Sequence, residues 1–306
     1  MKVLVTGGAG FIGSHIVEYL VQRGDDVTVL DNLNNGKMQN LSKVNNDINF
    51  VNGDVRDYKL IERLAKDSDG VFHEAALVSV PQSFEMQDEY FDVNVNGTEN
   101  ILKLAKEYGF KVIYASSSSV YGNPKQIPIK ESDNRNPINP YAQTKLKAEL
   151  LAEKYSQNDV HVIGLRYFNV FGRRQSKEYA GVIKLFLERI QQNKAPKING
   201  DGLQTRDFVY VEDVVKANIL AMDSNVKHQF FNVGVGYSIS ILDLANMVID
   251  AHGLSLKPIH ISQLPGDIQA SQADLELIKK LLNWKAKIKL DDWLIEVIST
   301  KNFTDI

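Results

Sequence analysis

VLVTGGAGFIG, residues 3–13, decides the fold of this chain. An apolar run of β-forming residues comes first, glycines follow at a spacing of three, and residues 11–23 continue with the period of an amphipathic helix. Gly7 permits a tight turn from strand to helix, Gly10 lets the backbone approach a pyrophosphate, and Gly13 lets the helix lie close to the sheet. Free N–H groups and the helix dipole favour negative charge at a helix N-terminus. The stretch therefore predicts a dinucleotide site.

A carboxylate ends the second predicted strand. Asp31 follows the run 26–30 and lies 18 residues after Gly13, where it would accept hydrogen bonds from the adenosine ribose. A carboxylate there repels a 2′-phosphate, so we expect NAD rather than NADP. Asp54 and Val55 follow the third strand and are expected at the adenine edge. A purely structural glycine turn and an ordinary turn aspartate would give the same local pattern.

The remaining pattern is that of β-α units, which predicts a parallel sheet. We expect an α/β fold, a Rossmann-like doubly wound parallel sheet with a smaller, intertwined C-terminal substrate lobe. Residues 1–169 and parts of 203–235 are assigned to the NAD-binding domain, and 170–202 and 236–306 to the substrate lobe. Strands are predicted at 2–6, 26–30, 49–51, 70–73, 111–115 and 161–167, and helices at 11–23, 59–66, 86–108, 141–157, 181–192, 211–222, 241–251 and 273–282.

Composition excludes several classes of function. The 306 residues are 43% apolar and 24% charged with a net charge of −3, so no global field attracts nucleic acid or an anionic membrane. The absence of cysteine excludes disulfides and thiolate metal sites, and the six histidines show no metal-ligand spacing, so no metal is expected. No apolar stretch is long enough to span a bilayer, and we expect a cytoplasmic protein.

Tyr141 and Lys145 are the strongest candidates for chemistry. Four residues apart on a predicted helix, they share one face, and an ammonium lowers the pKa of a nearby tyrosine by favouring the phenolate. Tyr121 and Lys125 have the same spacing, but Pro124 separates them in a loop. The run Ser116-Ser117-Ser118-Ser119 directly follows the strand 111–115, at the edge where ligands bind in open α/β sheets.

Eight stretches carry a family resemblance over nearly the whole chain. The sequence resembles the extended short-chain dehydrogenases/reductases, and in particular nucleotide-sugar 4-epimerases of the UDP-glucose/UDP-N-acetylglucosamine type. The stretches are TGGAGFIGSH at 6–15, HEAALVSVPQS at 73–83, NVNGT at 94–98, SSSSVYG at 116–122, YAQTK at 141–145, RYFNVFG at 166–172, TRDFVYVED at 205–213 and SQAD at 271–274.

This resemblance implies roles for individual residues. Tyr141 would be the general base, Lys145 would hold the cofactor ribose and tune Tyr141, and Ser117 would bind the sugar 4′-hydroxyl. Asn94 would close over cofactor and substrate, and Arg206 would contact a phosphate of UDP. The implied NAD contacts are Gly7, Gly10, Phe11, Ile12, Gly13, Asp31, Asn32, Asp54, Val55, Ala75, Ala76, Asn94, Tyr141, Lys145 and Tyr167. The implied UDP-sugar contacts are Ser79, Ser117, Ser119, Tyr141, Asn169, Val182, Arg206, Asp267 and Ser271.

The same resemblance also bears on competing functions. Related 4,6-dehydratases carry an Asp-Glu couple where Ser118 and Ser119 stand, and UDP-glucuronate decarboxylases carry a glutamate at the second of these positions. Removal of water across C5–C6 needs an acid/base that moves a proton, and serine is too weak an acid for this. The two serines therefore argue against both reactions. UDP-glucuronate 4-epimerases usually have threonine at the position of Asn169, which weakens that substrate without excluding it. A reductase or an epimerase of a different nucleotide sugar would show much the same motifs. A non-catalytic NAD-binding protein typically lacks the tyrosine or the lysine, and both are present here.

Two positions bear on the substrate. Ser271 matches the position that walls the pocket beside the sugar C2 substituent; glucose-specific epimerases have tyrosine there, so serine predicts that N-acetyl sugars are accepted. Otherwise Ser271 would simply cap the helix 273–282. Leu264 stands where the family usually has a second phosphate-binding arginine, and Arg173, Arg174 or Lys177 could substitute for it.

The helices 86–108 and 141–157 resemble those that pair in family homodimers, although their apolar faces could simply cover the sheet.

Overall fold

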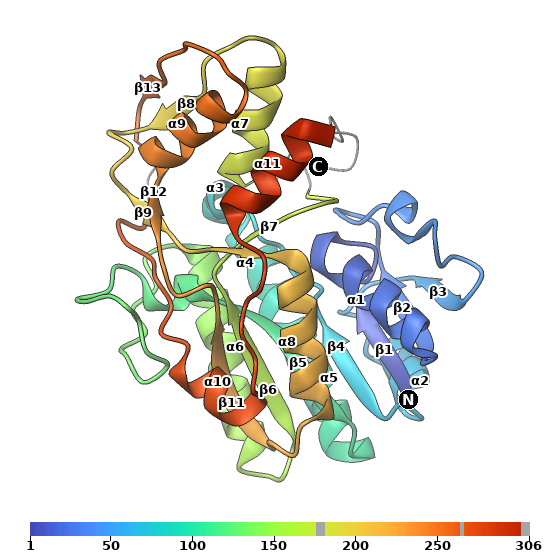
Figure 1. Cartoon of the computed structure of the whole chain (residues 1–306). Coiled ribbons are helices and arrows are strands. Elements are labelled where there is room, and N and C mark those ends of the chain that lie inside the picture. The colour runs from blue at the N-terminus through green and yellow to red at the C-terminus, as the bar shows by residue number, and fades with distance from the viewer. Residues whose placement is uncertain (176–180, 264–265, 301–306) are drawn as a thin grey trace.

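Seven parallel strands form the central sheet, which confirms the predicted fold class. The computed structural model describes residues 1–175, 181–263 and 266–300. The strand order is β11-β6-β5-β4-β1-β2-β3, with β1 between the two halves of the sheet (Figure 1). The bounds are β1 Lys2–Thr6, β2 Asp26–Asp31, β3 Ile48–Asn52, β4 Gly70–His73, β5 Lys111–Ser117, β6 Val162–Tyr167 and β11 His228–Val233. Strand β11, which the sequence pattern did not indicate, pairs with β6 at one edge.

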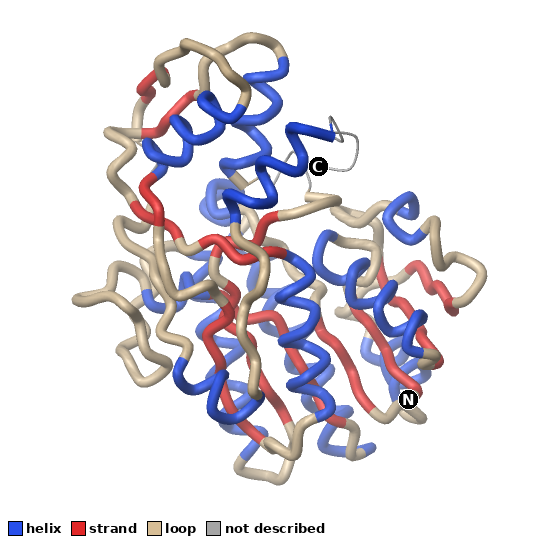
Figure 2. Tube along the Cα trace, in the orientation of Figure 1, coloured by secondary structure: helices blue, strands red, loops and turns tan. Residues whose placement is uncertain are grey.

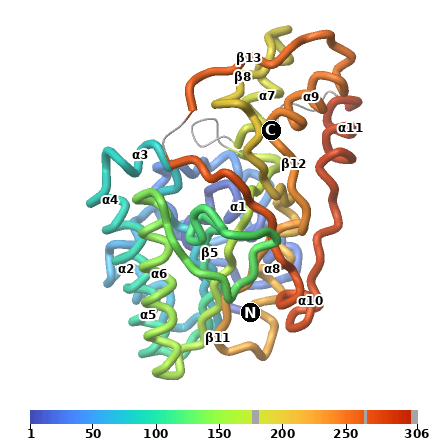
Figure 3. The backbone as a smooth tube through the Cα atoms, turned by 90° about the vertical axis from the view of Figure 1, so that its left-hand side faces the viewer, coloured from blue at the N-terminus to red at the C-terminus, as the bar shows by residue number. Residues whose placement is uncertain are grey.

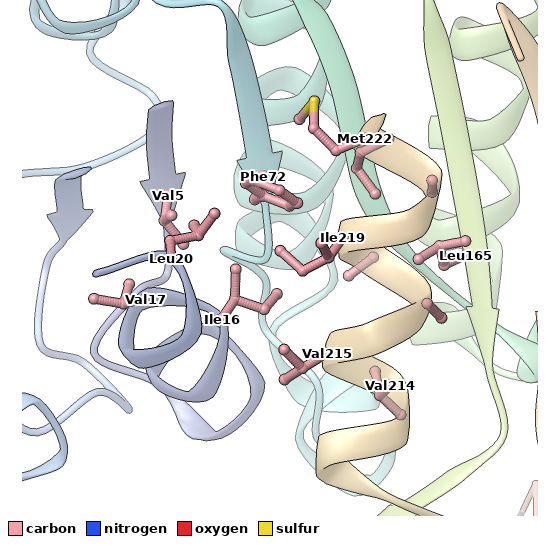
Figure 4. Packing of buried hydrophobic residues seen from close by; sticks show 14 of the residues in the cluster. Val5, Ile16, Val17, Leu20, Phe72, Leu165, Val214, Val215, Ile219 and Met222 are labelled. Carbon is pink, nitrogen blue, oxygen red and sulfur yellow. The ribbon is translucent and has the colours of Figure 1, made fainter. Parts of the chain in front are cut away.

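Alternating side chains of the strands supply two hydrophobic cores, one on each face. Val3 and Val5 of β1 point into one core and Leu4 into the other. The second core contains residues of α2 (Tyr58–Ala65), α5 (Gly97–Tyr108) and α6 (Pro140–Ser156), and α5 and α6 lie side by side in Figure 3. Figure 4 shows the first core, where α1 (Phe11–Arg23) and α8 (Val211–Asp223) contribute Ile16, Val17, Leu20, Val214, Val215 and Ile219 against Val5 and Phe72.

The helix predicted at 86–108 is not regular. Its chain forms α4 (Gln87–Phe91), a π-helical turn (Asp92–Asn96) and then α5, and it is preceded by a separate short helix α3 (Val80–Glu85). Such π-turns are frequent at functional sites because they re-aim side chains without ending the helix. Periodicity alone does not reveal one extra residue in a turn, which is why the sequence predicted a single helix.

A smaller lobe lies beyond the carboxyl ends of the strands (Figures 1 and 2). Its core contains the ring cluster Phe171, Tyr210 and Trp293, with centroids 5.1 to 6.3 Å apart. Its helices are α7 (Val182–Gln191), α9 (Ile241–Ala251) and α11 (Leu290–Thr300), and the last was not predicted. Short strand pairs accompany them: β7 (Asn169–Phe171) with β10 (Phe208–Tyr210), β8 (Lys197–Asn199) with β13 (Ile259–Ile261), and β9 (Thr205–Arg206) with β12 (Ile239–Ser240). Across the described ranges, no helix combines the length and apolar character that crossing a membrane requires.

Candidate active site

A cavity of about 590 Å³ opens at the carboxyl ends of the central strands. Residues after β2 and β3 line one half, and residues after β4, β5 and β6 line the other. The predicted site residues that the structure brings together in its wall are Gly7, Gly10, Phe11, Ile12, Gly13, Asp31, Asn32, Val55, Ala75, Ala76, Ser117, Tyr141, Lys145 and Tyr167. The predicted residues outside this wall are Ser79, Asp54, Asn94, Ser119, Asn169, Val182, Arg206, Asp267 and Ser271.

The glycine turn forms a cradle that only glycine can make. Gly7 has φ +69°, and a Cβ there would lie 2.6 Å from the backbone nitrogen of Ala75. A Cβ at Gly13 would lie 2.2 Å from the carbonyl oxygen of Gly7. Helix α1 begins directly after Gly10, and no side chain caps it. The cradle therefore fits a pyrophosphate, which the free N–H groups of the first helical turn would bind.

Asp31 organises the loops at the other end of the cradle. Its carboxylate accepts hydrogen bonds from the backbone N–H groups of Ala9 at 2.9 Å and Leu33 at 2.8 Å, while burial raises its pKa. A Cβ at Gly36 would lie 2.6 Å from this carboxylate. The close packing of Gly36 was missed, although the Asn35-Gly36 dipeptide is a turn signal that could have indicated it.

Asp54 is engaged by its neighbours rather than facing the cavity. Arg56 donates to it at 2.7 Å and Asn32 at 3.0 Å, and the Arg56 hydrogen bonds lower the pKa of Asp54 to about 2. Arg56 itself lines the cavity near Val55, and it was not predicted from the sequence. The pair nevertheless holds the Asn32 side chain on this side of the cavity.

Tyr141 and Lys145 lie one turn apart on α6, as predicted. Asn139 caps this helix by accepting a hydrogen bond from the N–H of Ala142 at 2.9 Å. The ammonium of Lys145 lies 5.9 Å from the centroid of the Tyr141 ring, and burial lowers the pKa of Lys145 to about 8. Burial raises the pKa of Tyr141, and a hydrogen bond with Ser117 acts in the opposite direction. An ionisable hydroxyl, an ammonium and a serine thus share one half of the cavity.

Tyr121, the competing tyrosine, is a structural residue. It is 2% exposed and lies outside the cavity. Its hydroxyl donates a hydrogen bond to the Asn232 side chain at 2.7 Å and accepts one from Arg166 at 2.7 Å. Burial raises its pKa, so it has neither access to a ligand nor a tendency to ionise.

Asn94 holds the cavity wall instead of lining it. From the π-helical turn it accepts a hydrogen bond from the N–H of Leu77 at 2.8 Å and donates to the Leu77 carbonyl at 2.9 Å. It also donates to Thr144 of α6 at 3.0 Å. Since Leu77 lines the cavity, Asn94 fixes one wall against the helix that carries Tyr141 and Lys145.

The predicted phosphate-binding arginine lies between the two lobes. Arg206 forms an ion pair with Asp267, and its side chain is mostly buried. Asn139, next to the start of α6, donates a hydrogen bond at 3.5 Å to the carbonyl of Gly266, the neighbour of Asp267. The segment that holds the partner of Arg206 is thus connected to the helix that carries Tyr141.

The cations that could replace a second phosphate-binding arginine differ in their surroundings. Arg174 forms an ion pair with Glu18 of α1. Arg173 is exposed. Leu264, which occupies the usual arginine position, and Lys177 lie outside the described residues.

The remaining predicted substrate residues come from several segments and lie outside the cavity wall. Ser79 caps α3, Ser119 is buried and its hydroxyl has no partner among the described residues, Val182 begins α7, and Asn169 begins β7. Ser271 is 5% exposed. Helix α10 (Glu276–Leu282) starts five residues later and has no side-chain cap, so the interpretation of Ser271 as a helix cap was wrong.

Two acidic groups in the cavity wall, Glu74 and Glu89, were not predicted from the sequence. Glu74 follows β4 directly and lines the cavity beside Ala75. The hydroxyl of Tyr167 donates a hydrogen bond to it at 2.9 Å, and burial raises the pKa of Glu74 to about 7. Its position at the carboxyl end of a central strand was the available signal.

Comparisons with known proteins agree with this geometry. The profile of the NAD dependent epimerase/dehydratase family matches residues 3–234. A UDP-glucose 4-epimerase of Mycolicibacterium smegmatis is 36% identical over 97% of both chains. A UDP-N-acetyl-alpha-D-glucosaminuronate decarboxylase of Bacillus cytotoxicus is 38% identical over 85% of this chain and 83% of its own. The structure of a UDP-N-acetylglucosamine 4-epimerase from Methanobrevibacter ruminantium, in complex with UDP-N-acetylmuramic acid, superposes with a TM-score of 0.92 at 38% identity over 97% of both chains.

Proposed function

Because this chain belongs to the NAD dependent epimerase/dehydratase family, we propose that it is an NAD-dependent isomerase that inverts C4 of UDP-hexoses. The observation that carries the proposal is the grouping of Ser117, Tyr141 and Lys145 in one half of a cavity whose other half holds the glycine cradle and Asp31. A dinucleotide bound with its pyrophosphate at the cradle and its adenosine toward Asp31 would place its nicotinamide beside Tyr141.

The proposed substrates are UDP-glucose and UDP-galactose together with UDP-N-acetylglucosamine and UDP-N-acetylgalactosamine. Relatives named for both sugar types, at 36% and 38% identity, support this range. Small Ser271 supports the N-acetylated pair. Arg206, with an ionic partner in Asp267 that a diphosphate could replace, would bind the UDP moiety.

Each chemical step is assigned to residues of the cavity. Ser117 would hold the 4′-hydroxyl, and Tyr141 would take its proton. When bound, NAD would supply reversible hydride transfer at C4, on opposite faces of the 4-keto sugar. Lys145 would bind the cofactor ribose and favour the tyrosinate. Tyr141 would then give its proton back to the new 4′-hydroxyl.

Other reactions on the same fold are less well supported. The decarboxylase and dehydratase reactions need an acid that Ser118 and Ser119 cannot provide. UDP-glucuronate remains a candidate substrate for 4-epimerisation, but Asn169 argues against it. A non-catalytic NAD-binding protein would not need Tyr141 and Lys145 in contact with the same cavity.

Product analysis tests the proposal. Purified protein is incubated separately with UDP-glucose, UDP-N-acetylglucosamine and UDP-glucuronate, and the products are separated by ion-exchange chromatography. The 4-epimers of the first two are expected without added cofactor, and denaturation should release NAD(H). Turnover of UDP-glucuronate alone, or activity only with added NADPH, would contradict it.

We also propose the division into an NAD-binding domain, residues 1–169 with parts of 203–235, and a nucleotide-sugar lobe, residues 170–202 and 236–306. Two copies would pair through the helical segment 86–108, which contains α4 and α5, and through α6. The separate ring cluster of the smaller lobe supports the division. Phe91 and Leu150 support the pairing, since they are 37% and 48% exposed on these helices. Light scattering should give a dimer mass for the wild type and a monomer mass for Leu150→Glu.

A further inference from the structure

Glu74 is an ionisable group in the cavity that the proposed reaction does not use. It lies after β4, between the glycine cradle and the ends of β5 and β6. Packing fixes its backbone, because its N–H donates to the carbonyl of Thr6 at 3.1 Å and a Cβ at Gly7 would lie 2.9 Å from its carbonyl carbon. The backbone of Glu74 is therefore fixed in the wall, and the hydrogen bond from Tyr167 holds its carboxyl group.

Two elements face this carboxyl group, and a third supports one of them. Tyr167 of β6 donates a hydrogen bond to it at 2.9 Å, and Asn218 of α8 donates to the same Tyr167 hydroxyl at 2.8 Å. Lys145 of α6 is the positive charge that acts on it through space. The ammonium of Lys145 donates a hydrogen bond to the carbonyl of Ala115 and not to Glu74. Within the part of the chain that the structure describes, Glu74 therefore has no cation at hydrogen-bond distance.

A dinucleotide bound as proposed would have its nicotinamide on the side of Glu74. Its adenosine would lie over β2 and β3, at Asp31 and Val55. Glu74 lies over the opposite half, with Ser117 and Tyr141. Oxidised nicotinamide carries a positive charge, and reduced nicotinamide carries none. A carboxylate beside the ring therefore stabilises the oxidised form selectively.

We propose that the carboxylate of Glu74 sets the balance between oxidised and reduced cofactor by favouring the cationic nicotinamide ring. This role rests on the proposed function. It would ensure that hydride is returned to the keto sugar, because the reduced cofactor is the less favoured form. The carboxylate is lost on protonation, so the effect should weaken as the pH falls.

Redox titration of the holoenzyme tests this role. Burial raises the pKa of Glu74 to about 7, so the titration is run at about pH 8.5, where the carboxyl group is charged. The absorbance of reduced nicotinamide is followed. Glu74→Gln keeps the shape and the acceptor for Tyr167 but removes the charge. It should shift the ratio of oxidised to reduced cofactor about tenfold toward the reduced form, which is about +30 mV for a two-electron couple. Asp88→Asn removes a charge from an exposed position outside the cavity wall, where water screens it, and should leave the potential near the wild-type value.

The outcomes separate the two proposals. A preparation that contains no NAD(H) overturns the proposed function, whereas a holoenzyme whose potential is the same in wild type and Glu74→Gln overturns only the role of Glu74. If Glu74→Gln does not fold, Tyr167→Phe takes its place. The hydrogen bond from Tyr167 lowers the pKa of Glu74, so its loss should leave more of Glu74 protonated near neutral pH. The potential should therefore rise near neutral pH and stay unchanged at high pH, where Glu74 is charged in both proteins. A wild-type potential at every pH in that variant also overturns the role.

Discussion

The ammonium of Lys145 donates a hydrogen bond to the backbone carbonyl of Ala115 at 2.8 Å. This bond joins α6 to the strand β5, two residues before Ser117, and so fixes the helix that carries Tyr141 against the strand end that carries the serine. Lys145 is 6% exposed, and its burial lowers its pKa to about 8. The charge near Tyr141 is therefore present at neutral pH and is lost as the pH rises above about 8 in the cofactor-free protein.

Replacing Lys145 should change the pH dependence of turnover. Without the ammonium, the phenolate of Tyr141 is less favoured, so the rising limb of the pH–rate profile for Lys145→Met should move to higher pH by about one unit or more. The matched control is Lys154→Met, which removes a lysine from an exposed position on the same helix. An unshifted limb in Lys145→Met, or an equal shift in both variants, would show that Lys145 does not tune Tyr141.

The two tyrosines should separate catalysis from stability. Tyr141→Phe should lose about two to four decades in kcat, the range for a positioned acid–base group, and keep its urea midpoint. Tyr121→Phe should lose about 1–3 kcal/mol of stability, because buried Arg166 and Asn232 lose a partner, and keep its kcat. The opposite assignment of the two effects would make Tyr121 the base.

The parts of the site that the sequence predicted are those made within short segments. Gly7 and Gly13 are constrained by the sterics of one turn, and Tyr141 and Lys145 by one helical repeat. Their spacing in the sequence was therefore sufficient to predict their roles in the site. The group of Glu74, Tyr167 and Asn218 comes from three segments far apart in the chain. Only the pairing of β4, β5 and β6 and the return of α8 bring these residues together, and no local pattern encodes that register. The strand β11 was missed for the same reason, since its partner is β6.

His73 should couple stability to pH. It is buried between the hydroxyls of Thr6 at 2.7 Å and Thr98 at 3.0 Å, and burial lowers its pKa to about 3. The folded protein keeps it neutral, whereas the unfolded chain binds a proton below about pH 6.5. Its contribution is therefore complete above about pH 6.5 and is lost as the pH falls toward 3.

Urea unfolding of wild type and His73→Gln at two pH values measures this linkage. Between about pH 7.5 and 5.5, the difference in unfolding free energy between the two proteins should shrink by about 1.4 kcal/mol. Comparison with the variant at each pH cancels the other titrating groups, among them Glu74 and Asp207, whose raised pKa values act with the opposite sign. A difference that does not change with pH would mean that His73 is protonated in the folded protein.

Ser271 should decide which sugars are accepted. Its segment is held firmly: the N–H of Ala273 donates to Asp207 at 3.0 Å, and Ile129 exchanges hydrogen bonds with Gln272 and Asp274 at 2.7 and 2.8 Å. A larger side chain at 271 could not be relieved by a shift of this backbone. Under the proposed function, it would compete for the space that the N-acetyl group needs while the keto sugar turns.

Ser271→Tyr should therefore lose turnover of UDP-N-acetylglucosamine and keep turnover of UDP-galactose. Overpacking costs about 1–3 kcal/mol at buried positions, so kcat/KM is measured below the unfolding transition of each protein. Ser271→Ala, which removes the hydroxyl without filling space, should keep both substrates and excludes a role for the hydroxyl. If Ser271→Tyr loses both activities equally, the effect lies in folding or in UDP binding, and Ser271 does not select at C2.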